Sequence, residues 1–262
     1  MIIVKGPVTR DRPLSLLLMI ACIDPSAPLP DCPTAPLPFK MPFRLPIFPL
    51  SVVLFPGNPL PLHIFEPRYR RMLADCLAAD RRFGLTPVSE DGGVPEPGAV
   101  GCVAEVRVNQ ELPDGRSNIV VVGIKRFVLS SLLNESLPYL VAMVQTFDDE
   151  KGSEPGAEEV EALRQLSLRY FTGLRELTDS VPEEVTLPED VETLSFHIAG
   201  SVESDLEMKQ RLLAERSTAR RVEHLLRLLP SVIEAIENGI TVRRRAHSNG
   251  RGGRMPDVLT GP

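Results

Sequence analysis

The chain has 262 residues and a mass of 28.9 kDa, which is enough for one large domain or two smaller ones. It is 43% hydrophobic and 24% charged with a mean hydropathy of +0.00, a composition that excludes wholesale disorder and a multispan membrane protein. The net charge of -6 divides into +1 for residues 1–40, zero for 41–147, -11 for 148–240 and +4 for 241–262. This balance argues against phosphate-backbone binding by the folded bulk, because that requires clustered Lys and Arg.

Residues 1–40 contain eight of the prolines around one apolar run, Leu14 to Ile23. The run is shorter than the ~20 residues that span a bilayer. Basic residues ahead of it, and Cys22 just after Met19-Ile20-Ala21, imitate an export signal. The alternative, which we favour, is a disordered leader or a mis-assigned start ahead of Met41. We therefore expect a cytoplasmic protein and no membrane association.

The four cysteines are Cys22, Cys32, Cys76 and Cys102. They form no CxxC pair and have no histidine at metal-ligand spacing, so we expect neither a metal nor another cofactor. Scattered thiols in a chain of this length are typical of a reducing compartment.

Short β-branched or alternating runs occupy much of the stretch from Phe43 to Phe147. Between two of them, Pro113-Asp114-Gly115 predicts a hairpin turn, since proline presets one φ and glycine accepts a positive one. Five or six short strands favour a closed or strongly curved sheet. The expected strands cover residues 43–50, 82–90, 99–108, 118–129 and 139–147.

One amphipathic helix interrupts these strands. Pro67 suits a first helical position, and the following apolar residues share one face: Tyr69, Met72, Leu73, Cys76 and Leu77. We expect this helix to cover one mouth of a small barrel.

The composition changes at Asp148, where a charged linker leads into helical periodicity. Asp205 and Ser217 are plausible N-caps, and Pro230 is expected to kink or split the last helix. The sequence thus predicts an α+β chain: a β-barrel over residues 41–147 with one covering helix, a helical bundle over 148–240, and a disordered basic tail over 241–262. The expected helices cover residues 160–171, 191–202, 206–213 and 222–236.

Several strings occur in the order found in one known family. They are "LPIFPLSVVLFPGNPLPLHIFEPRYRRML" (Leu45 to Leu73), "GIKRF" around Arg126, "PYLVAMV" (Pro138 to Val144) and "LSFHIAGSVESDLEMKQRLLAERSTARRVEHLL" (Leu194 to Leu226). Over about two hundred residues the chain resembles the N-terminal domain of the Lon protease family, and "LHIFEPRY" is more like its free-standing members. The resemblance implies a PUA-like barrel followed by a helical bundle, a module associated with recognising unfolded or tagged protein substrates.

The catalytic parts of a full-length Lon protease have no visible counterpart in the 262 residues. No GxxxxGK[ST] phosphate-binding loop occurs. The family's Ser–Lys dyad would follow residue 240, where no lysine is present. We therefore expect no ATPase or peptidase activity, and the chain is interpreted as not an enzyme.

His63 and Glu66 are the residues best placed in the sequence for cryptic chemistry. A His–Glu pair could transfer a proton if the fold brought the two within hydrogen-bond reach. No activated nucleophile accompanies them, so we expect packing, with Glu66 near the positive end of the following helix. A hydrolase using His63 and Glu66 stays the less favoured alternative.

The segment Leu54 to Leu62, termed the apolar rim, is the most plausible binding feature, although it could merely plug the barrel. Its prolines and Gly57 limit strand pairing, so we expect an irregular apolar surface. Such a surface could hold an extended peptide in a groove or at a free sheet edge. In "GIKRF", an inward Phe127 beside an outward Arg126 is ordinary strand alternation, with a binding role as the alternative. The candidate substrate-binding residues are Phe55, Pro56, Leu60, Leu62, His63, Phe65, Glu66, Arg68, Tyr69, Arg126 and Phe127.

The leading hypothesis is a non-catalytic module that binds unfolded or apolar protein segments in protein quality control. Its partners would be such segments and a separate ATP-dependent protease or chaperone. RNA binding is an alternative, because PUA-like barrels in other families bind RNA, but the charge distribution argues against a nucleic-acid partner.

Overall fold

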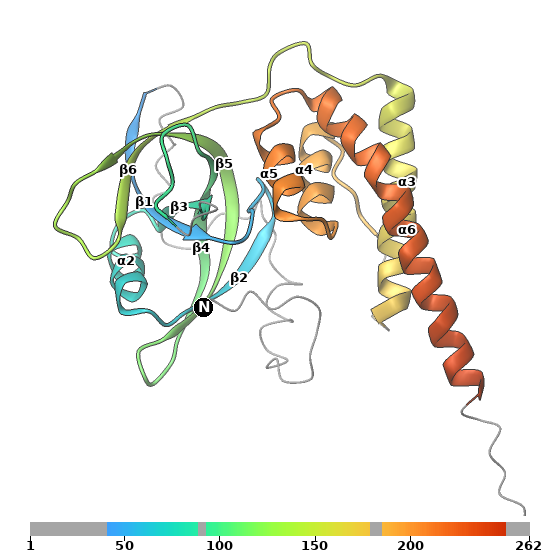
Figure 1. Cartoon of the computed structure of the whole chain (residues 1–262), viewed down its shortest axis with the longest axis horizontal. Helices are drawn as coiled ribbons and strands as arrows, with labels where there is room; N and C mark the ends of the chain where they lie inside the picture. The colour runs from blue at the N-terminus through green and yellow to red at the C-terminus, as the bar shows by residue number, and fades with distance from the viewer. Residues whose placement is uncertain (1–40, 89–92, 179–184, 250–262) are drawn as a thin grey trace, which may run out of the picture. The chain divides into compact units, whose positions relative to one another are not determined.

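The computed structural model describes residues 41–88, 93–178 and 185–249, with side chains as far as residue 244. The expected leader (residues 1–40) and the end of the expected tail (250–262) lie outside the described residues. Figure 1 shows a curved sheet with one helix against it, followed by the remaining helices. The α+β class predicted from the sequence is confirmed.

The sheet is mixed and returns on itself. Its strands are β1 (Phe43–Leu50), β2 (Pro59–Ile64), β3 (Arg82–Pro87), β4 (Val100–Glu111), β5 (Ser117–Leu133) and β6 (Leu140–Thr146). The order is β2-β5-β4-β3-β1-β6, and β5 also pairs with β6, so every strand except β2 belongs to a ring. Strands β1 and β3 are parallel, whereas the other pairs are antiparallel. β2 adds to β5 outside the ring.

Bulges give the long strand β5 its curvature. Its register against β4 shifts between Val103 and Ala104, where β5 has the extra residue Ile124. The turn between β4 and β5 is the predicted one: Gly115 has φ 77° and donates its N–H to Leu112 O at 2.8 Å. β5 can therefore pair with β2 and β4 in its first half and with β6 in its second.

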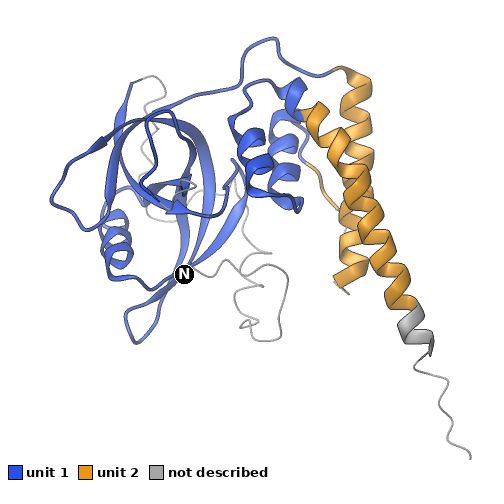
Figure 2. Cartoon of the chain, viewed as in Figure 1, with its two compact units in different colours: residues 1–155, 188–221 blue, residues 156–187, 222–262 orange. Residues whose placement is uncertain are grey.

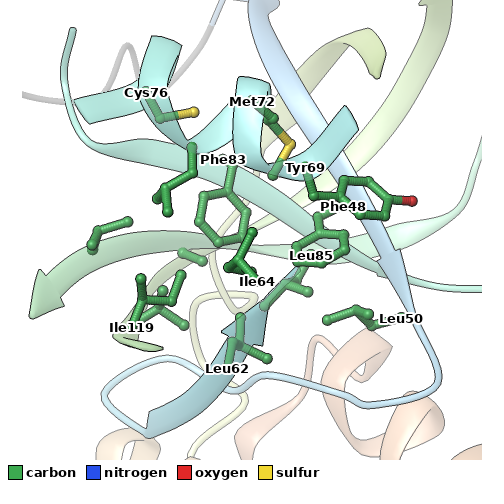
Figure 3. Close-up of a cluster of buried hydrophobic side chains, with 14 of the residues drawn as sticks. Phe48, Leu50, Leu62, Ile64, Tyr69, Met72, Cys76, Phe83, Leu85 and Ile119 are labelled. Atoms are coloured by element: carbon green, nitrogen blue, oxygen red, sulfur yellow. The ribbon is translucent and has the colours of Figure 1, made fainter. Parts of the chain in front are cut away.

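Helix α2 (Pro67–Leu77) covers the sheet with the predicted face. Tyr69, Met72 and Cys76 are buried in one apolar cluster with Phe48 and Phe83. Figure 3 shows these side chains directed from α2 and from the strands into the same interior. Burial of this surface stabilises the packing of α2 on the sheet by about 25 cal/mol per Å² of apolar area.

The remaining helices are α3 (Ala157–Thr178), α4 (Val191–Ser201), α5 (Leu206–Ala214) and α6 (Thr218–Asn249). Asp205 caps α5 by accepting from Met208 N, and Ser217 Oγ accepts from Arg220 N, as predicted. α6 continues through Pro230 without being split. It also includes residues 241–249, where the sequence predicts a disordered tail.

The chain divides into two compact units, shown in Figure 2. Among the described residues, unit 1 contains those from Met41 to Pro155 and Pro188–Arg221, and therefore includes the sheet, α2, α4 and α5. Unit 2 contains Gly156–Leu187 and the part of the chain from Val222 onward, and its helices α3 and α6 are joined by the ion pair Arg169–Glu237. This division differs from the expected boundary at residue 148, because α4 and α5 group with the sheet.

Candidate functional site

A groove lies within unit 1 between the loop before β2 and the helices α4 and α5. Its volume is about 410 Å³. One wall is apolar and comes from Val52, Val53, Leu54, Pro59 and Leu60. Val52 and Leu60 are half-buried, so their side chains leave apolar surface open to a ligand. We call this feature the apolar groove.

The opposite wall is formed by His197, Gly200, Ser201 and Lys209, from α4, its C-terminal end and α5. Lys209 Nζ donates to the carbonyl oxygen of Gly200 at 3.3 Å. Burial lowers the pKa of His197 and of Lys209, with the charge of Glu203 opposing the shift at Lys209. The groove thus combines an apolar wall with a wall that carries one ammonium group.

Asn58 joins the two walls. Its side-chain Nδ2 donates to the carbonyl oxygens of Phe196 at 3.2 Å and His197 at 3.4 Å, both on α4. Its main chain is held to β5, because its carbonyl accepts from Gly123 N at 3.1 Å. Gly123 must be glycine, since a Cβ there would lie 2.1 Å from Phe55 O. The loop is therefore fixed to the sheet on one side and to α4 on the other.

A buried ion cluster holds α4 and α5 against the sheet, and we call it the Asp149 cluster. Arg221 donates to Asp149 with 2.6 Å between Nη2 and Oδ2, and Arg126 bonds the other carboxylate oxygen. Arg126 also donates to the carbonyl oxygen of Leu213, in the last turn of α5, at 3.1 Å and to that of Glu215, the C-cap of α5, at 2.6 Å. The side chain of Arg126 is 2% exposed and that of Arg221 is 0% exposed. Strand β5, the segment after β6 and the first turn of α6 meet at one carboxylate.

Electrostatics keep this carboxylate ionised. Burial opposes ionisation of Asp149, but hydrogen bonds from Arg221 and Thr218 and the charges of Arg221 and Arg126 outweigh it and lower its pKa. Two aromatic rings complete the cluster. Arg221 lies 3.9 Å above the ring of Phe196, and Arg126 lies 4.5 Å from the ring centre of Phe147.

Two further hollows in unit 1 share Phe147 and Asp148. One, of about 240 Å³, includes Pro56, Lys125 and Glu192. The other, of about 640 Å³, includes Val100, Thr146 and Arg216. Both have mixed polar and apolar linings, and they lie over the Asp149 cluster, whose residues Arg126 and Asp149 line one hollow each. The apolar groove is the hollow whose wall is mainly hydrocarbon.

The sequence-predicted site residues separate into distinct places. Phe55 and Leu60 line the apolar groove, and Pro56 lines the neighbouring hollow. Phe55 is 0% exposed and Leu62 is 4% exposed, so these two do not form the expected exposed surface. The expectation of an irregular rim is wrong for residues 59–62, which belong to β2 because their main chain pairs with β5.

His63, Phe65, Glu66 and Arg68 lie where β2 leads into α2. His63 Nδ1 is 2.8 Å from Asn118 Oδ1, whereas Glu66 accepts from Arg68 Nε at 2.9 Å. The His63 ring stacks on the ring of Phe65, with 5.9 Å between the ring centres. The structure does not form the His63–Glu66 hydrogen bond that proton transfer would need. Arg68 also lies 4.5 Å above the ring of Tyr69, which is buried in the core.

Arg126 and Phe127 are both buried, so the expected inward–outward alternation is wrong at Arg126. The bulge at Ile124 changes the register of β5, and the α5 end and Asp149 then cover the guanidinium group. Phe127 packs in the second apolar cluster of the sheet with Leu45 and Val144. Arg126 is thus a structural residue of the Asp149 cluster.

Sequence reasoning missed the polar wall of the apolar groove. Asn58 and Lys209 are 151 positions apart, and no spacing rule connects a loop asparagine with a helix lysine. One available signal was Gly200 within a helical pattern, because glycine inside a helix often marks a close approach of another segment. In the described ranges no group of three or more His, Cys, Asp or Glu could hold a metal, and no helix is long and apolar enough to cross a membrane.

A family model for the ATP-dependent protease La (LON) substrate-binding domain matches residues 44–231. The chain belongs to this family. It is 25% identical over 219 residues to the Lon protease of Cytophaga hutchinsonii, covering 80% of this chain and 27% of that protein. It is 26% identical over 212 residues to the Lon protease of Escherichia coli K12, covering 77% of this chain and 26% of that protein. The LON-family chain thus spans about a quarter of the length of the curated relatives it matches.

Two solved structures have a similar fold. The Lon N-terminal domain protein from Xanthomonas campestris gives a TM-score of 0.53 at 23% identity, covering 70% of this chain and 97% of that one. The N-terminal domain of the Mycobacterium avium complex Lon protease gives a TM-score of 0.54 at 17% identity, covering 73% of this chain and 98% of that one. At these identities the likeness supports the LON N-terminal fold.

Proposed function

We propose that this LON-family chain is a non-catalytic substrate-binding module that holds apolar segments of unfolded proteins in the apolar groove. Its role would be to present clients to a separate ATP-dependent protease or chaperone in cytoplasmic protein quality control. The observation that carries the proposal is the groove itself: a hydrocarbon wall, in which Val52 and Leu60 are left partly open, beside α4 in a member of a substrate-binding family. The PUA-like character of the barrel is part of the same proposal.

The groove is large enough for one or two apolar side chains, at about 410 Å³. Burying a Leu or Phe side chain contributes about 1.5–3 kcal/mol. A dissociation constant near 1 μM needs about 8 kcal/mol, so neighbouring parts of a client must add contacts. Weak binding that tolerates many apolar sequences is the expected property of such a site.

Binding in the groove is favoured over addition of a strand to β2. The carbonyl of Asn58 points to β5, so by strand alternation the main-chain groups of Leu60 and Leu62 also point to β5. Pro59, Pro61 and His63 then face the free edge, and the prolines have no N–H to donate. A client strand would find few donors along this edge.

The alternatives have less support. A hydrolase would need His63 to act with Glu66, and their hydrogen bonds go to Asn118 and Arg68 instead. RNA binding would need a basic surface, but the barrel segment 41–147 is neutral and 148–240 carries -11. The buried arginines of the Asp149 cluster do not supply such a surface, because their charges are enclosed.

The test uses a reduced, alkylated model protein that cannot refold, titrated with the full chain. We expect wild-type binding at micromolar concentrations and at least a tenfold weaker affinity for Leu60→Asp, because a carboxylate would then lie in the apolar wall. Leu132→Asp is the matched control: Leu132 is 37% exposed on β5 and does not line the groove. Circular dichroism establishes that each variant is folded.

No binding by folded wild-type protein at tens of micromolar would refute the proposed function. Equal affinity of the Leu60→Asp and Leu132→Asp variants would instead refute the placement of the site in the groove.

A further inference from the structure

Half-buried Lys209 differs from the buried cations of the described residues in what it binds. Arg126 and Arg221 share the carboxylate of Asp149, and Arg82 pairs with Glu105 at 3.2 Å. Lys209 Nζ donates to a main-chain carbonyl, that of Gly200. No carboxylate among the described residues lies within ion-pair distance of it. Exposed Glu203 acts on Lys209 through its charge alone.

This ammonium group borders the apolar groove. It is half-buried on α5 and carries the one full charge among the groove residues, since His197 is kept neutral by a pKa below its ordinary value. Loss of water at a partly enclosed ammonium is compensated best by a carboxylate, because a charge-assisted hydrogen bond is about twice as strong as a neutral one. The groove therefore complements a ligand that joins a carboxylate to an apolar group.

We propose that the apolar groove binds the C-terminal residue of a polypeptide, with its apolar side chain against Val52 and Leu60 and its terminal carboxylate on Lys209 Nζ. This proposal rests on the proposed function and specifies which part of a client enters the groove. The C-terminal residue is the one place in a polypeptide where a carboxylate and an apolar side chain belong to the same residue. An internal Asp or Glu would direct its own polar side chain at Lys209 and leave the apolar wall to a neighbour.

The experiment compares two fluorescent peptides of one apolar sequence, ending in Leu as the free acid or as the C-terminal amide. At low salt we expect the free acid to bind the full chain at least tenfold more tightly. Lys209→Met keeps most of the apolar stem and removes the charge, so it should reduce the affinity for the acid to that for the amide. Lys209→Arg should keep a preference for the acid. Lys151→Met is the matched control, because Lys151 is exposed and lies away from the groove residues.

The outcomes separate this inference from the proposed function. Equal binding of acid and amide, or a preference that survives Lys209→Met, overturns the C-terminal inference and leaves apolar client binding intact. Failure of both peptides and of the unfolded model protein to bind refutes the proposed function itself. A third arm uses decanoate as competitor: tight binding of decanoate without binding of the acid peptide would assign the groove to fatty acids and overturn the choice of a polypeptide.

Discussion

Asn58 and Gly200 meet more closely than any larger residue at position 200 would allow. A Cβ built on Gly200 would lie 1.5 Å from Nδ2 of Asn58, the atom that donates to the carbonyls of Phe196 and His197. The loop before β2 and the helix α4 therefore approach each other through a glycine and an asparagine. This contact sets the width of the apolar groove, because both residues line it and Asn58 joins its two walls.

Gly200→Ala should separate these walls. The added methyl group must displace a buried side chain that makes two hydrogen bonds, so we expect a loss of about 1–3 kcal/mol in unfolding free energy and weaker client binding. Gly93→Ala is the control, since a Cβ on Gly93 meets nothing within 4 Å. Urea unfolding and peptide titration measure both effects. If Gly200→Ala had the same unfolding free energy as wild type, the Asn58–Gly200 contact would not restrict the size of residue 200.

Asp149→Asn should destabilise unit 1 by about 3–5 kcal/mol, because it leaves two buried guanidinium groups without their carboxylate. The control is Asp114→Asn, whose partner Arg116 is exposed, and we expect its urea midpoint to match that of wild type. Equal midpoints for Asp149→Asn and wild type would mean that α4 and α5 are held to the sheet by other contacts.

The same cluster predicts a pH dependence. The pKa of Asp149 in the folded protein lies below its ordinary value of 3.8, so its ionised form stabilises the fold. That contribution is complete when the pH lies above the ordinary pKa of 3.8, and it is lost as the pH falls through the lowered pKa of the folded protein. The difference in unfolding free energy between wild type and Asp149→Asn should therefore be constant near neutral pH and shrink below about pH 4.

Glu192 contributes with the opposite sign, because burial and the charge of Asp149 raise its pKa. Taking the difference between wild type and Asp149→Asn removes the part of this background that is due to burial, which is the larger cause. A difference that stayed constant down to pH 2 would contradict the role assigned to Asp149.

The two described thiols should be unreactive in the folded protein. Burial raises the pKa of Cys76 and of Cys102 to about 12, so few thiolates form at neutral pH. In a Cys22→Ser/Cys32→Ser variant, a thiol reagent should label native protein slowly and urea-unfolded protein at once. Rapid labelling of the native variant would show that α2 or the sheet opens readily.

Local patterns were sufficient to predict much of the sheet and the helix that covers it. β1 was expected at residues 43–50 and is observed there, and the turn at Gly115 has the backbone that its sequence favours. The buried face of α2 was also predicted, because Tyr69, Met72 and Cys76 recur at helical spacing. These features depend on residues close together in the chain.

Contacts between distant segments could not be predicted in this way. Pro59 and Pro61 argued against a strand, but β2 lies at an edge where its prolines face away from β5. Arg126 alternates with Phe127 and seemed exposed, yet Asp149 and Arg221 enclose it. Lys209 enters the groove because α5 packs near the end of α4, which depends on tertiary structure.

The central claim, client binding in the apolar groove, is tested most directly by site-specific photocross-linking. A benzophenone amino acid replaces Leu60 in one variant and Leu132 in another, and each is irradiated with the unfolded model protein. We predict a cross-linked product from position 60 that a free apolar peptide suppresses, and little product from position 132. Equal cross-linking at both positions, or none at position 60 while the client remains bound, would contradict the assignment of this groove as the binding site.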